Sequence, residues 1–155
     1  MSDDGDAGAR LRAQALAALA RREHSRAELQ RKLAARGHAA ADIARVLDDF
    51  AAARLQSDAR YTEAYVRSRA SRGFGPQRIA QELKQRGAGA EDISQALADP
   101  EHDWRALAAH ADRRKFGAHP PGDFVTAAKR RRHLEYRGFA PDQIRDVLRG
   151  TGLDE

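Results

Sequence analysis

The sequence repeats one short pattern three times, at intervals of 50 and 51 residues. Each copy has a leucine shortly before an Arg-Gly pair, and an isoleucine and a leucine at helical spacing after it. The copies are Leu33, Arg36-Gly37, Ile43 and Leu47; Leu83, Arg86-Gly87, Ile93 and Leu97; and Leu134, Arg137-Gly138, Ile144 and Leu148. A fixed period of this length is typical of supersecondary units that stack to bury a shared core. The chain is therefore predicted to be an array of three similar units.

The middle copy, residues 73–87, indicates what each segment forms. Pro76 suits the first helical position, since an N–H would be unpaired there anyway. Ile79 and Leu83 lie one turn apart and share a face. Gly87 follows the last helical residue and suits a left-handed C-cap. The pattern predicts a helix between two turns. It also predicts positive φ at the glycine of each Arg-Gly pair.

Composition and capping signals predict an all-α fold. Alanine and arginine are the most frequent residues, leucine is common and β-branched residues are few. Ser25 and Glu28 predict a capping box, and Asp99 with Pro100 is expected to begin the seventh helix. The nine predicted helices cover about 9–22, 25–36, 42–50, 58–72, 76–86, 91–98, 100–116, 123–136 and 141–149.

These helices fall into three groups of three, so we predict three tandem three-helix repeats. The repeats are expected at 9–56, 57–99 and 100–150. Residues 1–8, which are small, acidic and glycine-containing, are expected to be a disordered N-terminus, and 151–155 a C-terminal tail.

Several function classes are disfavoured by the sequence. The chain has no cysteine, which excludes disulfides and thiolate metal sites and fits a cytoplasmic protein. Its apolar runs are too short to span a membrane, and the acidic N-terminus is unlike a signal peptide. The six histidines lack the spacing of a helical metal site, and no nucleophile, base or phosphate-binding loop stands out. We therefore expect no catalytic residue, metal or cofactor.

Positive charge is concentrated in two segments. Residues 60–86 and residues 103–140 each carry a net charge of +5, which equals the formal charge of the whole chain. Such basic segments point to an anionic partner, and the alternative is a solvated helical surface without a partner.

The repeated residues resemble the RecX family of bacterial recombinase regulators. The first repeat has Arg22, Ser25, Glu28-Leu29, Lys32-Leu33 and Arg36-Gly37 in the family spacing. The second has Asp58, Arg60-Tyr61, Tyr65-Val66, Arg69, Gly75-Pro76, Arg78-Ile79, Glu82-Leu83 and Arg86-Gly87. The third has Arg114-Lys115-Phe116-Gly117 and Tyr136-Arg137-Gly138-Phe139. The third repeat departs from the pattern at Arg130, where the other two have an apolar residue.

The resemblance implies an elongated, curved array of three-helix repeats. It also implies binding along the groove of the RecA–DNA filament, with inhibition of strand exchange, ATP hydrolysis and coprotease activity. The expected partners are the RecA nucleoprotein filament and, secondarily and through charge, DNA. We expect no membrane partner and a monomeric protein.

Candidate filament- or nucleic-acid-binding residues come from the basic segments. They are Arg60, Arg67, Arg72, Arg78, Lys84, Arg113, Arg114, Lys115, Lys129, Arg130, Arg132, Tyr136 and Arg137. Arginine suits this task because its planar fork binds phosphate or carboxylate bidentately. Among the aromatic residues, Trp104 and Phe124 are expected in the core, and Tyr136 is the better candidate for stacking.

A second hypothesis is a stand-alone DNA-binding protein, because three-helix units with a short turn resemble helix-turn-helix modules. Such a protein would concentrate base contacts on one recognition helix, for which Gln77 and Arg78 are the best candidates. The charge is spread over the second and third repeats, which favours a protein that lines a filament.

Overall fold

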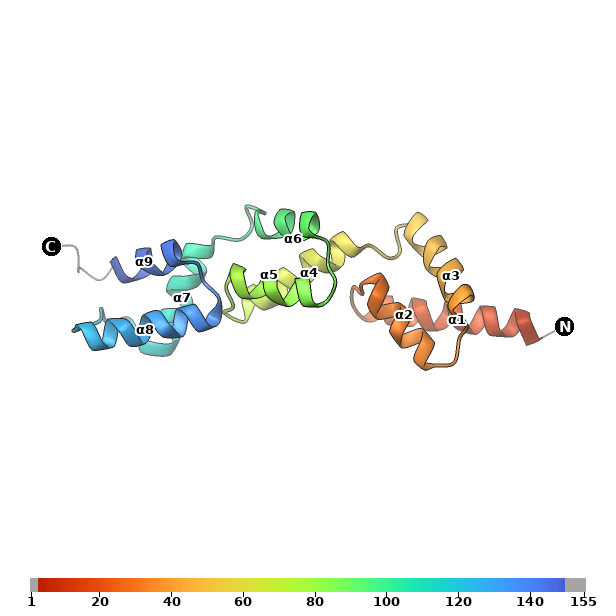
Figure 1. Ribbon diagram of the computed structural model, residues 1–155, viewed down its shortest axis with the longest axis horizontal. Coiled ribbons are helices and arrows are strands. Elements are labelled where there is room, and N and C mark those ends of the chain that lie inside the picture. Colours follow the sequence, from red (N-terminus) through yellow and green to blue (C-terminus); the bar gives the residue numbers. More distant parts are fainter. Residues whose placement is uncertain (1–2, 150–155) are drawn as a thin grey trace. The chain divides into compact units, whose positions relative to one another are not determined.

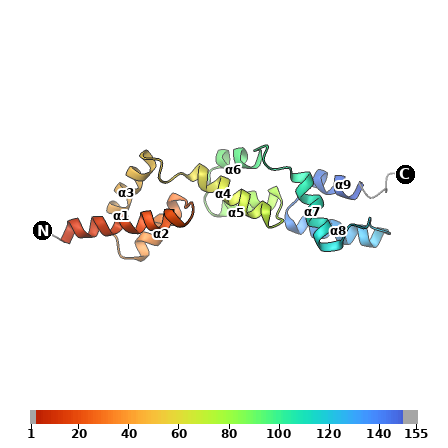
Figure 2. The same cartoon turned by 180° about the vertical axis from the view of Figure 1, so that it is seen from behind.

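The computed structural model describes residues 3–149, which form nine α-helices and no strand (Figure 1; Figure 2 shows the reverse side). The helices are α1 (Asp3–Arg21), α2 (Arg26–Ala35), α3 (Ala40–Ala52), α4 (Asp58–Ser71), α5 (Pro76–Gln85), α6 (Ala90–Leu97), α7 (Trp104–Phe116), α8 (Phe124–Arg137) and α9 (Pro141–Arg149). The prediction of an all-α fold is confirmed. The helix pairs with the most extensive packing belong to α1–α3, α5–α6 and α7–α9. The chain divides into two compact units, Met1–Ala64 and Tyr65–Glu155, and the division falls within α4.

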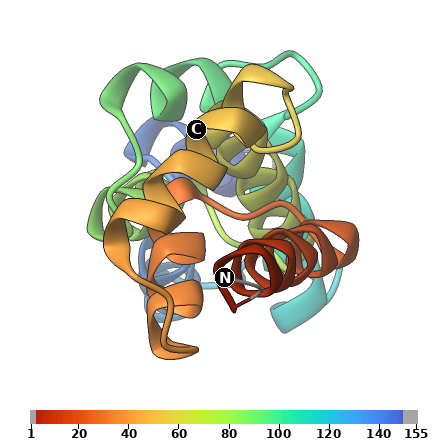
Figure 3. The ribbon, with the colours of Figure 1, turned by 90° about the vertical axis from the view of Figure 1, so that its right-hand side faces the viewer.

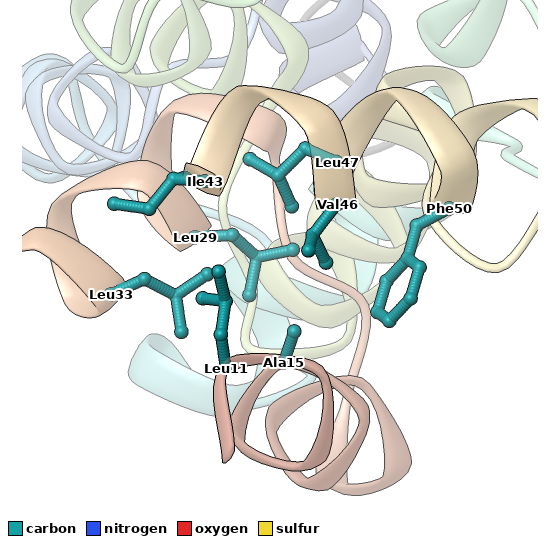
Figure 4. Close-up of a cluster of buried hydrophobic side chains, with 8 residues drawn as sticks. All are labelled: Leu11, Ala15, Leu29, Leu33, Ile43, Val46, Leu47 and Phe50. Atoms are coloured by element: carbon teal, nitrogen blue, oxygen red, sulfur yellow. The ribbon is translucent and has the colours of Figure 1, made fainter. Parts of the chain in front are cut away.

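The core of the first unit lies between α1, α2 and α3 (Figure 4). Helical spacing places apolar side chains on one face of each helix, so the three faces meet. Figure 3, which views α1 nearly end-on, shows α2 and α3 beside it. The buried side chains are Leu11, Ala15, Leu29, Leu33, Ile43, Val46, Leu47 and Phe50. Each fully buried leucine stabilises the fold by about 1.5–3 kcal/mol.

In the second unit, one apolar cluster lies between α7, α8 and α9. Its buried members are Ala108, Ala111, Leu134, Phe139, Ile144 and Leu148, and Trp104 packs against them. Trp104 thus packs against the core, as expected, but is only partly buried. On α5, Ile79 and Leu83 are buried, as their shared face predicted.

Short polar side chains begin four of the helices. The Ser25 Oγ accepts a hydrogen bond from the Glu28 N–H at 3.1 Å, and Ser57 caps α4 in the same way. Asp103 and Asp123 cap α7 and α8. Glu28 does not complete the predicted capping box: its carboxylate binds both terminal nitrogens of Arg22. A bidentate arginine pair is stronger than a hydrogen bond to a neutral N–H, so the charged partner wins.

Three expectations about local structure are wrong. Helix α1 begins at Asp3, so residues 3–8 are helical and not disordered. Residues 1–2 and the predicted tail at 151–155 lie outside the described residues.

Helix α7 begins at Trp104, because Asp103 caps it, whereas Asp99 stabilises a preceding turn by accepting from the Glu101 N–H. Phe124 is 86% exposed, since it is the first residue of α8 and lies beyond the helices that could cover it.

The start of α5 is bonded directly to the end of α8 (Figures 1 and 2). The Gly75 N–H donates to the Arg137 carbonyl at 2.8 Å, and the Gln77 N–H donates to the Gly138 carbonyl at 2.9 Å. Pro76, between them, has no N–H to satisfy. The free donors of one helix end thus pair with the free acceptors of another, and the two helix dipoles meet with opposite signs. We call this contact the α5–α8 joint.

Only glycine fits on both sides of the joint. A Cβ on Gly75 would lie 2.5 Å from the Gly138 carbonyl carbon and from the Phe139 nitrogen. A Cβ on Gly138 would lie 2.7 Å from the Arg78 nitrogen. The predicted positive φ is confirmed at Gly37 (91°), Gly87 (83°) and Gly138 (97°), but only Gly138 combines it with a close backbone neighbour.

The departure at Arg130 has a structural explanation. Arg130 occupies the core position that its place in the repeat predicts, and it is only 4% exposed. Its Nε donates to Asp112 Oδ1 at 2.9 Å, its Nη2 pairs with Asp112 Oδ2, and its Nη1 donates to the His119 carbonyl at 2.7 Å. Hydrogen bonds to Asp112 raise the pKa of Arg130, so the guanidinium stays charged. The pair links α7, α8 and the loop between them.

Replacing the three C-cap glycines by alanine tests the close approach. Gly37→Ala and Gly87→Ala should each lower the free energy of unfolding by about 1 kcal/mol, because a Cβ is forced into the left-handed region. Gly138→Ala should cost about 1–3 kcal/mol more, because the added methyl group also meets the Arg78 backbone. Urea unfolding of the three variants measures this difference, and equal losses in all three would contradict the joint.

The buried ion pair can be tested by removing one partner or both. Arg130→Met should destabilise the protein by about 3–5 kcal/mol, because Asp112 is left buried without its counter-ion. The double variant Arg130→Met/Asp112→Leu should recover most of that loss. Arg12→Ala, which breaks an exposed pair with Asp49, is the control and should cost under about 1 kcal/mol. A double variant as unstable as Arg130→Met would show that the loss does not come from the unpaired carboxylate.

Candidate binding surface

The predicted binding residues differ in how far their side chains are exposed to solvent. The exposed ones are Arg67, Arg72, Lys84, Arg113, Arg114, Lys115, Lys129, Arg132 and Tyr136. Arg60, Arg78 and Arg137 are half-buried, and Arg130 is buried. Arg130 must therefore be removed from the candidate surface, because its guanidinium is fully used inside the third helix group.

Two of the predicted cations already have carboxylate partners. Arg60 Nε lies 3.0 Å from Glu23 Oε1 in the first unit, and Arg67 Nε lies 3.3 Å from Glu101 Oε1 in the second. Exposed pairs of this kind are weak and can exchange partners, but each carboxylate reduces the local positive potential. Arg60 and Arg67 are accordingly weaker candidates than the unpaired cations.

Three arginine side chains contact the Phe74 ring next to the α5–α8 joint. The guanidinium carbons of Arg69, Arg78 and Arg137 lie 3.8, 4.6 and 4.7 Å from the centre of its ring. The Arg78 Nη1 also donates to the Tyr136 carbonyl at 3.1 Å. Cation–π contacts of this geometry stabilise by about 0.5–2 kcal/mol each. Arg78 and Arg137, predicted as binding residues, therefore also hold the joint together.

A pocket of about 440 Å³ lies where the turn after α4 meets α7 and α8. It is lined by Ser71, Arg72, Gly73, His110, Ala111, Arg114, Lys115, His133 and Arg137. We call it the basic pocket, because four of its residues are cations and none is a carboxylate. Within residues 3–149, none of the four makes an ion pair. The fold therefore brings together predicted residues that are far apart in the sequence.

Burial and the surrounding charges tune the titratable groups of this region. Burial lowers the pKa of His133, the Arg137 and Lys115 charges lower it further, and Asp112 acts in the opposite direction. Burial and the neighbouring cations therefore favour the neutral imidazole of His133. On α8, the Thr126 N–H hydrogen bond lowers the pKa of the capping residue Asp123.

A second group of cations lies on the outside of α8. Lys129 and Arg132 are exposed one turn apart, and Tyr136, which is 73% exposed, continues the same face. The Arg78 guanidinium lies 5.0 Å from the Tyr136 ring. Tyr136 is therefore accessible, as a residue that stacks on a base must be, and its role in stacking stays a prediction. Phe124 and Val125 add exposed apolar surface at the start of the helix.

Several residues of this region could not be identified from the sequence. His110 and His133 belong to the basic pocket because of tertiary packing alone, and no spacing rule links α7 to α8 across a long loop. Arg131 is exposed, and only its place in the run of four cations at 129–132 could have identified it. Phe124 is predicted to lie in the core but is exposed, because helical spacing does not show whether a helix extends past its neighbours.

The described residues match neither the pattern of a metal site nor that of a membrane-spanning helix. Among these side chains, no group of three or more histidine and acidic residues is arranged to hold a metal ion. No helix within residues 3–149 combines the length and apolar character needed to cross a membrane. The exposed cations and their N–H groups suit this surface to binding an anion through charge and hydrogen bonds.

Comparison with protein families identifies all three helix groups. Residues 12–50 match the family model described as "RecX, first three-helix domain". Residues 57–97 match the second three-helix domain, and residues 101–148 match the third. Three tandem three-helix domains are thus established, as predicted, and each lies within one of the predicted repeats.

Curated relatives and solved structures agree with this assignment. The chain is 46% identical over 155 residues to "Regulatory protein RecX" of Halorhodospira halophila, covering 100% of this chain and 96% of the relative. It is 45% identical over 145 residues to the protein of the same name in Pseudomonas putida GB-1, covering 94% and 93%. The crystal structure of RecX from Lactobacillus salivarius has the same fold, with a TM-score of 0.80, 20% identity, and coverage of 96% of this chain and 99% of that one. The chain belongs to the RecX family of regulatory proteins.

Proposed function

We propose that this protein regulates the RecA recombinase by binding along the groove of the RecA–DNA filament. On this proposal it inhibits strand exchange, ATP hydrolysis and coprotease activity, acts in the cytoplasm as a monomer, and needs no cofactor. The observation that carries the proposal is the presence of all three RecX domains, in order, over residues 12–148. The relatives are named as regulatory proteins, which supports a regulator over an enzyme.

The charge distribution supports an anionic partner. A filament on DNA carries a line of phosphate charges, and exposed lysines and arginines gain free energy there by releasing counter-ions. The exposed, unpaired cations of α7 and α8 are the best candidates, and they include Lys129 and Arg132. Several weak contacts on one chain can give high affinity on a repeating partner without any single strong site.

The contacts of α5 disfavour the stand-alone helix-turn-helix reader. A recognition helix inserts its N-terminal side chains into the major groove. Here the Gln77 N–H is bonded to the Gly138 carbonyl, and Arg78 packs against Phe74 and Tyr136. The start of the α5 backbone is thus covered by the end of α8, and Arg78 is held by contacts inside the protein, although the Gln77 side chain is exposed.

Charge reversal on α8 tests the proposal. Lys129→Glu/Arg132→Glu should raise the concentration needed to inhibit RecA's DNA-dependent ATP hydrolysis by at least about tenfold, because two attractive charges become repulsive. The matched control is Arg31→Glu/Arg54→Glu, which reverses two exposed, unpaired cations of the first unit and should have a much smaller effect. Circular dichroism checks that both variants keep their helix content.

The same assay separates a filament regulator from a general DNA binder. The unmodified protein should inhibit at amounts well below one molecule per RecA, whereas a protein that merely covers DNA should need near-saturating amounts. A folded Lys129→Glu/Arg132→Glu variant that inhibits at the original concentration would remove α8 from the docking surface. Inhibition only at saturation would contradict filament regulation itself.

A further inference from the structure

We propose that the basic pocket binds a phosphodiester group of DNA, so that this part of the surface contacts the nucleic acid and not the recombinase. The inference rests on the proposed function only because it assumes that the DNA is the DNA of the RecA filament. The pocket itself is a property of the second unit and can be tested with DNA alone. The positive charge of these residues would attract either a phosphate or a protein carboxylate. The proposal assigns them to phosphate.

The arrangement of donors favours phosphate over carboxylate. A single arginine fork satisfies a planar carboxylate, as the Arg69–Glu82 pair shows with distances of 3.0 and 2.8 Å. The basic pocket instead presents cations from three segments, with Arg72 from the turn after α4, Arg114 and Lys115 from α7, and Arg137 from α8. Donors that converge from several directions suit the tetrahedral oxygens of a phosphate, and about 440 Å³ leaves room for the attached sugar.

Arg137 is held in position before any ligand binds. Its guanidinium lies over the Phe74 ring, and its Nη1 donates to the Arg72 carbonyl at 3.4 Å. The α5–α8 joint fixes the end of α8 from which the side chain projects. A cation whose position is set by packing loses less conformational entropy on binding than a free surface lysine. The pocket is therefore prepared for an anion on the Arg137 side.

The first domain carries a basic pocket at the corresponding place. A cavity of about 690 Å³ between α1 and α2 is lined by Arg21, Arg22, Lys32 and Arg36, among others. Lys32 and Arg36 occupy the repeat positions of His133 and Arg137. In the second domain the position of Lys32 is taken by Glu82, which pairs with Arg69. A basic pocket in the first and third domains, with a carboxylate at the equivalent position of the second domain, fits a partner that repeats, as a phosphate backbone does.

His133 provides a reporter inside the pocket. The charged and titratable groups around it are Arg137 on its own helix, Asp112, Arg114, Lys115 and His110 from α7, and Arg72 from the turn after α4. The Phe116 ring packs edge-on at 5.5 Å. A phosphate seated among these cations would add a negative charge next to the imidazole and favour its protonated form. DNA binding should therefore raise the pKa of His133.

The first measurement follows His133 by NMR while the full-length protein is titrated with acid. The probe is an oligothymidylate of about 16 nucleotides. The pKa of His133 should rise when the oligonucleotide is present, and polyglutamate of similar charge should produce a much smaller rise. An unchanged pKa at saturating oligonucleotide would overturn the proposal. An equal rise with polyglutamate would also overturn it, because the pocket would then accept carboxylates of a protein partner.

The second measurement compares two variants from which the same amount of charge is removed. Arg114→Gln/Lys115→Gln removes two cations of the pocket, and Arg31→Gln/Arg54→Gln removes two exposed cations outside it. At low salt, the pocket variant should bind the oligonucleotide at least about tenfold more weakly than the control. Its salt dependence, log K against log salt concentration, should be shallower by about 0.7 for each phosphate that the variant no longer binds. Equal affinities in the two variants would exclude the pocket as a phosphate site.

Inhibition of RecA by the same preparations separates the two claims. A pocket variant that binds DNA like the control yet still inhibits RecA would contradict the pocket and leave the proposed function intact. A protein that binds DNA through the pocket but never inhibits RecA would contradict the proposed function alone.

Discussion

The α5–α8 joint is the contact on which the second unit depends. Two backbone hydrogen bonds connect the ends of helices that are about sixty residues apart in the sequence, and they require glycine at both Gly75 and Gly138. Neither glycine buries a side chain, so the joint depends on close backbone approach and on paired helix ends. The arginines around Phe74 then cover it with cation–π contacts. The joint fixes the turn after α4 and the end of α8 that line the basic pocket.

The arginines of this protein consequently serve two different purposes. Arg69, Arg78, Arg130 and Arg137 are tied to rings, carboxylates or carbonyls inside the second unit. Arg114 and Lys115 line the basic pocket, and Lys129 and Arg132 lie on the open face of α8. Arginine can do both because its planar guanidinium stacks on aromatic rings while still donating hydrogen bonds. A high arginine content is therefore no direct measure of the surface available to a partner.

The periodic features of the fold could be predicted from the sequence, and the features that depend on tertiary packing could not. The repeat predicted the all-α class, the buried leucine and isoleucine positions and the three left-handed glycines, because each follows from local spacing and capping. Asp103 displaced the expected cap at Asp99, and Phe124 proved exposed, since neighbouring helices decide such details. For the site, local charge made the exposed cations and the neighbouring Tyr136 candidates, but it could not show that Arg130 pairs with Asp112 or that His133 lies beside Lys115. Those contacts join side chains of different helices, so no pattern within the sequence of one helix indicates them.

On the proposed function, the second unit meets the RecA–DNA filament through the end of α7 and the outer face of α8. Hydrogen–deuterium exchange of the unmodified protein, alone and on preformed filaments, tests this docking most directly. Amides at the end of α7 and along α8 should exchange more slowly on the filament, while those at the start of α5, already bonded to α8, should change little. Protection confined to the first unit, or no protection on saturated filaments, would contradict docking through α7 and α8.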